Sequence, residues 1–106
     1  MRTLQEIMAQ DLARKADRRE HPRTPVSLRG RVYCGSKDVD CTVIDMSPAG
    51  AQIKAAGIFE VASVVTLKIA NFGAVHARVI WQREDRLGLQ FLEDARRIAL
   101  RFERVL

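Results

Sequence analysis

The sequence has few of the residues that hold metal ions or form disulfide bonds. Among 106 residues there are two cysteines and two histidines: Cys34, Cys41, His21 and His76. A structural zinc site normally needs four closely spaced ligands, and these histidines are poorly placed to complete one. We therefore expect no metal or other cofactor, and two reduced thiols on small side chains that are buried or half-buried.

Long apolar runs are also absent. The apolar stretches are too short and too often interrupted to span a bilayer. A secretory signal is not recognisable after Met1 either, because Glu6 and Asp11 interrupt the apolar segment that such a signal requires. We therefore expect a cytoplasmic protein without a membrane span. The hydrophobic content of 47% still allows one folded domain with a real core.

Aromatic residues make up only 6% of the chain. A binder of single-stranded nucleic acid stacks bases on exposed aromatic side chains, and only Tyr33, Phe59 and Phe72 are plausible exposed ones here. Trp81 is in phase with the apolar residues of its predicted strand, so we expect it in the core. A nucleic-acid partner is therefore disfavoured, although small basic barrels often have one.

No residue pattern supports catalysis. The chain has no carboxylate pair, metal cluster or activated nucleophile with a recognisable spacing. Ser47, His76 and Asp45 lack the sequence of a nucleophile elbow, and His76 is expected on the surface. We therefore expect that the protein is not an enzyme.

Positive charge is concentrated near the two ends of the chain. The net charge is +5 at pH 7. The N-terminal cluster comprises Arg14, Lys15, Arg18, Arg19 and Arg23. Arginine outnumbers lysine in it, which favours bidentate recognition of phosphate or of a purine edge. A second group alternates with acids and is expected to be a solvated helix face; it consists of Arg96, Arg97, Arg101 and Arg104.

Changes of hydrophobic period divide the chain into helices and strands. Thr3 and Glu6 form a capping-box pattern, and helical spacing predicts an amphipathic helix over residues 4–17. Alternating residues predict six strands near 26–33, 39–43, 51–55, 64–69, 75–81 and 87–91. Asp94 opens a closing helix whose apolar face should cover the strands, with Ala95, Ile98, Phe102 and Val105. The pattern is typical of an all-β fold with flanking helices, a six-stranded antiparallel β-barrel.

Two short motifs flank the first predicted hairpin. Arg19 and Arg23 lie four residues apart in a segment that Pro22 and Pro25 keep extended. Such a segment is either an ordinary solvated linker or a rigid mount for two guanidinium groups.

The second motif, Asp45-Met46-Ser47-Pro48-Ala49-Gly50, follows the second predicted strand. Its residue types are those of a tight turn: Asp45 can accept hydrogen bonds from backbone N–H groups, and Gly50 can supply a positive φ. It also offers a carboxylate that matches the N1 and N2 donors of guanine. Both readings are compatible, because a rigid turn is a suitable place to hold a ligand.

Taken together, the two motifs resemble the signature of the PilZ domain, a family of bacterial receptors for cyclic di-GMP. Arg19-x-x-x-Arg23 precedes the first strand, and Asp45-x-Ser47-x-x-Gly50 follows the second. Residues 77–81 and 87–91 resemble the closing strands of that family, and the similarity covers about residues 18–95. Each motif alone is weak, whereas the pair in this order is fairly specific.

The resemblance implies a six-stranded barrel that binds cyclic di-GMP across its outer surface. Arg19 and Arg23 would bind phosphates and a guanine edge, with Arg18 stacking on a guanine or helping to hold a ligand dimer. Asp45 and Ser47 would bind the other side of a guanine, and Gly50 would permit the turn. The segments would then be an N-terminal helix (1–17), the barrel domain (18–95) and a C-terminal helix packed on the barrel (96–106).

The function that follows is a non-enzymatic second-messenger receptor that signals to a downstream protein partner by changing conformation. Two alternatives stay open: a protein-interaction adaptor that has the fold but no ligand, and a basic barrel that binds single-stranded nucleic acid. The sequence does not select the partner, the oligomeric state or the number of ligands.

Overall fold

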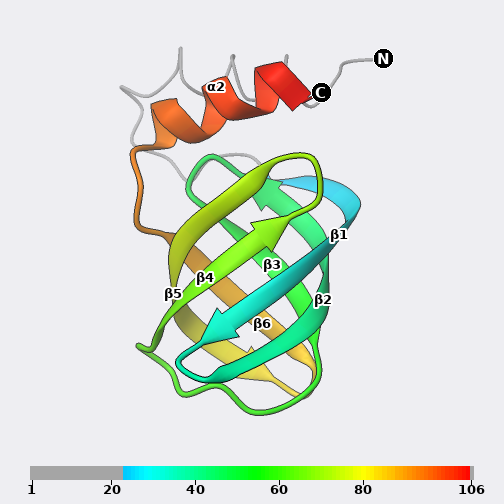
Figure 1. Cartoon of the computed structure of the whole chain (residues 1–106), viewed down its shortest axis with the longest axis vertical. Helices are drawn as coiled ribbons and strands as arrows, with labels where there is room; N and C mark the ends of the chain where they lie inside the picture. Colours follow the sequence, from blue (N-terminus) through cyan, green and yellow to red (C-terminus); the bar gives the residue numbers. More distant parts are fainter. Residues whose placement is uncertain (1–22, 106) are drawn as a thin grey trace.

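The computed structural model describes the backbone of residues 23–105 and the side chains of residues 23–101 (Figure 1). The predicted helix over residues 4–17, together with Arg18 and Arg19, lies outside the described residues. The elements in chain order are β1 (Thr24–Cys34), β2 (Lys37–Ser47), β3 (Gly50–Ala55), β4 (Val64–Ile69), β5 (Gly73–Arg83), β6 (Arg86–Phe91) and α2 (Ala95–Val105).

The six strands close into one antiparallel barrel. Their order around it is β1-β2-β3-β6-β5-β4, and β4 pairs with β1 to complete the ring. The predicted barrel is therefore confirmed. β1, β2 and β5 extend well beyond the strands predicted near 26–33, 39–43 and 75–81. Each of the three has 11 residues. Because the ring is closed, every described strand has a neighbouring strand on both sides, and none is an edge strand over its whole length.

The core fills the inside of the barrel with aliphatic side chains. Inward positions alternate with outward ones along each strand, and Ile53, Leu67 and Leu87 are completely buried. Cys34 and Cys41 are free thiols, half-buried and buried respectively, as the sequence predicted. Burial is the main factor that raises the pKa of the Cys41 thiol to about 11, so this group is a neutral core residue at physiological pH.

The two phenylalanines expected at the surface are buried. Phe59 is 4% exposed and Phe72 is 7% exposed, whereas Tyr33 is half-buried. Each phenylalanine sits in a connection between strands, where a basic side chain covers its ring. Lys37 Nζ lies 4.4 Å from the centre of the Phe59 ring, and the Arg101 guanidinium lies 4.5 Å from that of Phe72. The two connections therefore bury these rings in the core cluster rather than exposing them to solvent.

The β-bulges in β2 and β5 change which residues face outward. In β2, Val43 pairs with Ile53 and Asp45 with Gln52, so Ile44 has no partner on β3. In β5, Val79 pairs with Leu89 and Trp81 with Gly88, so Ile80 is the extra residue. An inserted residue shifts the alternation by one position, and side chains beyond it point to the opposite face.

The second bulge overturns the prediction that Trp81 belongs to the core. Trp81 pairs with Gly88, an outward position on β6, and is half-buried outside the barrel. Its indole covers Gly88 so closely that a Cβ there would collide with the ring. A simple period of two, continued from Val79, could not reveal this, because the extra residue Ile80 resets the phase.

Helix α2 lies across one end of the barrel (Figure 1). Asp94 caps it, because its Oδ1 accepts a hydrogen bond from the Arg96 backbone N–H at 2.8 Å. Ile98 and Ala99 are buried in the core cluster, which confirms part of the predicted apolar face. The side chains of Phe102 and Val105 lie outside the described ones. Arg101 fastens the helix by donating to the Ala74 carbonyl at 2.7 Å.

Two isoleucines five positions apart test the core. Ile53 is completely buried and Ile58 is 80% exposed. We expect Ile53→Ala to lower the free energy of unfolding by about 2–5 kcal/mol through lost burial and a cavity. Ile58→Ala is the matched control and should change it by no more than about 0.5 kcal/mol. Urea unfolding followed by circular dichroism measures both, and equal effects would contradict the described core.

Candidate functional site

The structure joins the two sequence motifs through an ion pair. Arg23 Nη1 donates a hydrogen bond to Asp45 Oδ1 at 2.7 Å, across 22 positions of sequence. The pair lies at the surface, with side-chain exposures of 47% for Arg23 and 20% for Asp45. A cation from the first motif and the acid of the second therefore meet on one outer face. Arg18 and Arg19 lie outside the described residues.

The bulge at Ile44 is what aims Asp45 outward. Val43 and Met46 are both completely buried although three positions separate them. Without the extra residue, Asp45 would be in phase with Val43 and would point into the core. The sequence analysis placed Asp45 at this turn but did not detect the bulge, since Ile44 resembles any other strand residue.

Ser47 holds the turn together. It is 3% exposed, and its Oγ accepts a hydrogen bond from the Ala49 backbone N–H at 3.1 Å. Pro48 is also buried, which leaves the turn rigid. The side chain that was predicted to bind ligand beside Asp45 is thus engaged with its own turn in this structure.

Gly50 has a different structural role from the one considered in the sequence. The glycines with positive φ are Gly35, Gly57 and Gly73, so Gly50 does not supply a left-handed conformation. A Cβ on Gly50 would instead collide with the backbone carbonyl of Leu89 on β6. Ala49 O also accepts the Phe91 N–H at 2.8 Å. The glycine is needed because the turn lies directly against β6.

Asp45 begins a row of outward positions that crosses four strands. It pairs with Gln52 on β3, which pairs with Gly88 on β6, which pairs with Trp81 on β5. Directly opposite residues in antiparallel strands share a face. The row therefore presents a carboxylate at one end and an indole at the other, with the amide of Gln52 between them.

A hollow of about 620 Å³ continues from this row toward the turn between β5 and β6. Arg83 and Arg86 face each other across that hairpin, and neither forms an ion pair within the described part of the chain. The lining residues are Gln52, Trp81, Arg83, Glu84, Asp85 and Arg86. The sequence analysis did not identify Gln52 or the two arginines as site residues. The only sequence feature that pointed to this face was Gly88, a glycine in the middle of β6, on which the Trp81 indole lies.

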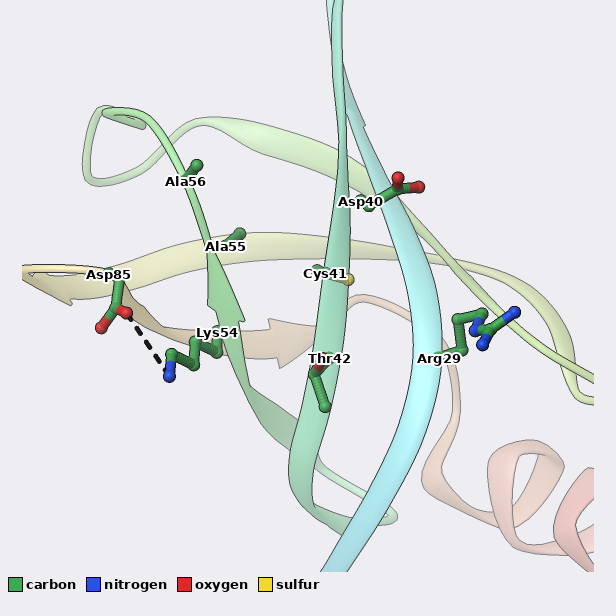
Figure 2. A pocket seen from close by; sticks show the side chains of 8 residues that line it. All are labelled: Arg29, Asp40, Cys41, Thr42, Lys54, Ala55, Ala56 and Asp85. Atoms are coloured by element: carbon green, nitrogen blue, oxygen red, sulfur yellow. Dashed lines mark ion pairs between the residues drawn. The ribbon is translucent and has the colours of Figure 1, made fainter.

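A second hollow, of about 580 Å³, lies over β1, β2 and β3 (Figure 2). Its charges are largely balanced: Lys54 Nζ lies 3.8 Å from Asp85 Oδ2, and Asp40 accepts a hydrogen bond from Arg31 at 2.5 Å. Figure 2 shows Arg29 extending away from Thr42 and Lys54 rather than converging with them. This hollow therefore offers no concentrated charge for a ligand.

Residues 23–105 contain no cluster of three or more histidine, cysteine or acidic side chains arranged to hold a metal ion. None of the helices described is long and apolar enough to cross a bilayer.

The described residues thus form a small closed antiparallel β-barrel with an acid–arginine pair on its outer face. Comparison with family models gives a match to the PilZ domain over residues 17–104, so the chain belongs to the PilZ family. The predicted family is therefore confirmed.

A solved structure shares the fold. It is the PilZ domain of CeSA from a cellulose-synthesizing bacterium, with a TM-score of 0.64 and 21% sequence identity. The match covers 78% of this chain and 92% of that one. A search of curated proteins gave no match.

Substitution of Gly50 tests whether its role is steric. Gly50→Ala should lower the free energy of unfolding by about 1–3 kcal/mol, because β3 and β6 must separate to admit the methyl group. Gly35→Asn is the control: nothing lies within 4 Å of its Cβ position, φ is 63°, and asparagine tolerates this conformation. An unchanged thermal midpoint for Gly50→Ala would contradict the steric role.

Proposed function

We propose that this protein is a non-enzymatic receptor for cyclic di-GMP, the ligand that PilZ domains generally bind. The observation that carries the proposal is the contact between Arg23 and Asp45 on the outer face of the barrel. It brings the two motifs of the family signature together at one place. A ligand with both phosphates and guanines matches a site that contains both a guanidinium and a carboxylate.

Asp45 is the group suited to a guanine base. A carboxylate only accepts hydrogen bonds, and guanine presents two neighbouring donors, N1–H and the N2 amino group. Arg23 engages one oxygen of Asp45 through one of its own nitrogens. The guanidinium therefore keeps donors for a phosphate or for the O6/N7 edge of a guanine. Ser47 and Gly50 would act mainly by holding the turn that carries the acid.

Trp81 and the arginine pair extend the site beyond the motifs. Strands lie about 4.8 Å apart, so three steps from β2 to β5 span about 14 Å, and the indole shortens that span by lying over Gly88. A base held near Gln52 can stack on the indole. Arg83 and Arg86 line the hollow beside it together with two acidic side chains, so their guanidinium groups would serve a phosphate as hydrogen-bond donors rather than through an excess of positive charge.

Ligand binding would hold Arg18 and Arg19 against the barrel by charge pairing and would reposition the predicted N-terminal helix. A downstream protein would read this conformational change. This mechanism requires no chemistry on the ligand.

Titration calorimetry of the purified full chain with cyclic di-GMP tests the proposal. We expect Arg19→Ala, Arg23→Ala and Asp45→Asn each to weaken binding by about 10- to 100-fold, the effect of losing a hydrogen bond to a charged group. Arg96→Ala and Asp40→Asn, both at exposed positions, are matched controls and should bind like the wild type. All variants should melt cooperatively. Absence of heat for the wild type at high micromolar ligand would contradict the proposal and leave the adaptor as the alternative.

Fluorescence gives a separate test of the extended site. Trp81 is the only tryptophan in the chain, so its emission reports on this face alone. We expect cyclic di-GMP to quench it, with a midpoint equal to the calorimetric dissociation constant, because a stacked base changes the surroundings of the indole. Trp81→Leu should weaken binding by about 1–3 kcal/mol. Calorimetric binding without any change in emission would exclude Trp81 from the site.

A further inference from the structure

Exposed aliphatic side chains gather beside the second half of β5. Val61 is 60% exposed, Val64 is 49% exposed and Ile80 is 44% exposed. Val61 belongs to the connection between β3 and β4, Val64 begins β4, and Ile80 is the bulged residue of β5. We call these three residues the β5 patch.

Backbone contacts bring the members of the β5 patch together. Val64 pairs with Arg78 on β5, and Ile80 lies two positions further on, a diagonal neighbour on the same face. The Ala62 N–H donates to Val79 O at 2.7 Å, and the Val79 N–H donates to Ser63 O at 2.9 Å. Val61 is therefore held next to β5 as well.

The loop that carries Val61 is fixed rather than loosely attached. Gln82 donates to the Gly57 carbonyl and accepts from the Phe59 N–H, both at 2.8 Å. Ala62 has a φ of 80°, a conformation that an L-residue rarely adopts and that the surrounding contacts must hold in place. The barrel thus holds an exposed apolar surface in one defined shape. Figure 1 shows this loop at the end of the barrel remote from α2, so the helix does not cover it.

Opposite charges border the β5 patch without neutralising each other. Arg78 lies opposite Val64, and Glu60 directly precedes Val61. Neither side chain forms an ion pair or a side-chain hydrogen bond with the described part of the chain. Among the described side chains the border therefore carries a cation and a carboxylate that are not paired with each other, whereas the chain as a whole is positively charged.

We propose that the β5 patch is the interface of a homodimer, occupied by a second copy of this chain. A two-fold axis places the same surface on both sides, so an interface must complement itself. Apolar side chains would meet at the centre, and Arg78 would face Glu60 of the partner subunit twice. A purely acidic partner fits less well, because it would repel Glu60. The six described strands close into a ring, so we expect the contact to be made by side chains rather than by pairing of strands.

Sedimentation equilibrium of the full chain without nucleotide tests the dimer over roughly 5 to 500 µM, a range suited to a small interface. We expect the weight-average mass to rise toward twice the monomer mass. Ile80→Glu should raise the dimer dissociation constant at least about tenfold, since it buries an unpaired charge. Leu100→Glu is the matched control: Leu100 is 57% exposed on α2, and its variant should dimerise like the wild type.

Reversing the charges of Arg78 and Glu60 tests whether these two residues face each other across the proposed dimer interface. Arg78→Glu and Glu60→Arg should each weaken the dimer about tenfold, because like charges would then face each other. The double variant should recover to within about threefold of the wild type, as expected for a direct contact. A wild type that stays monomeric over the whole range would overturn the proposal. So would a dimer insensitive to Ile80→Glu, or a double variant that shows no recovery. Thermal melts confirm that each variant is folded, and none of these outcomes depends on nucleotide binding.

Discussion

The direction of Asp45 depends on one residue in β2 that has no partner on β3. Side chains of a strand alternate between the two faces, so the apolar sequence of β2 commits every second position to the core. The extra residue Ile44 interrupts this alternation, so both Val43 and Met46 can be buried. As a result, the carboxylate can meet Arg23 in solvent while the barrel keeps its interior apolar. Trp81 joins the outward row of Gln52 and Gly88 only because of the second bulge, which lies in β5.

The Asp-x-Ser-x-x-Gly motif consists of one exposed acid and two residues that shape the turn. Asp45 is the exposed member and faces the arginine of the first motif. Ser47 satisfies a backbone N–H of the turn, and Gly50 permits close contact with β6. The position of the acid therefore depends on a turn that lies directly against its neighbouring strand.

Most of the architecture could be predicted from the sequence, because alternation and turn residues are local properties. All six strands were found, and β4 has the predicted bounds, Val64–Ile69. The errors have a common cause. Trp81, Phe59 and Phe72 were misplaced because their positions depend on a bulge or on a loop folding over the end of the barrel. Such features depend on contacts between distant segments, and no local pattern encodes them.

The candidate site could be predicted only in part, because some of its residues belong to local motifs and others depend on the pairing of distant strands. Arg23 and Asp45 could be named from their motifs, and their meeting needed only the hairpin between them. Gln52, Arg83 and Arg86 could not, since they reach the site by register across β3, β6 and β5. The ligand-binding roles of all six predicted site residues remain predictions: Arg18, Arg19, Arg23, Asp45, Ser47 and Gly50.

Closure of the barrel has a further consequence for how such a protein can diversify. A sheet with a free edge recognises other chains through backbone groups, which are the same in every sequence. Here the ring of six strands uses those groups internally, so the selectivity of any encounter is encoded in individual outward side chains. Each of these can change by a single substitution without disturbing the strands beneath. One stable framework can therefore acquire new partners by point mutation while its folding remains the same.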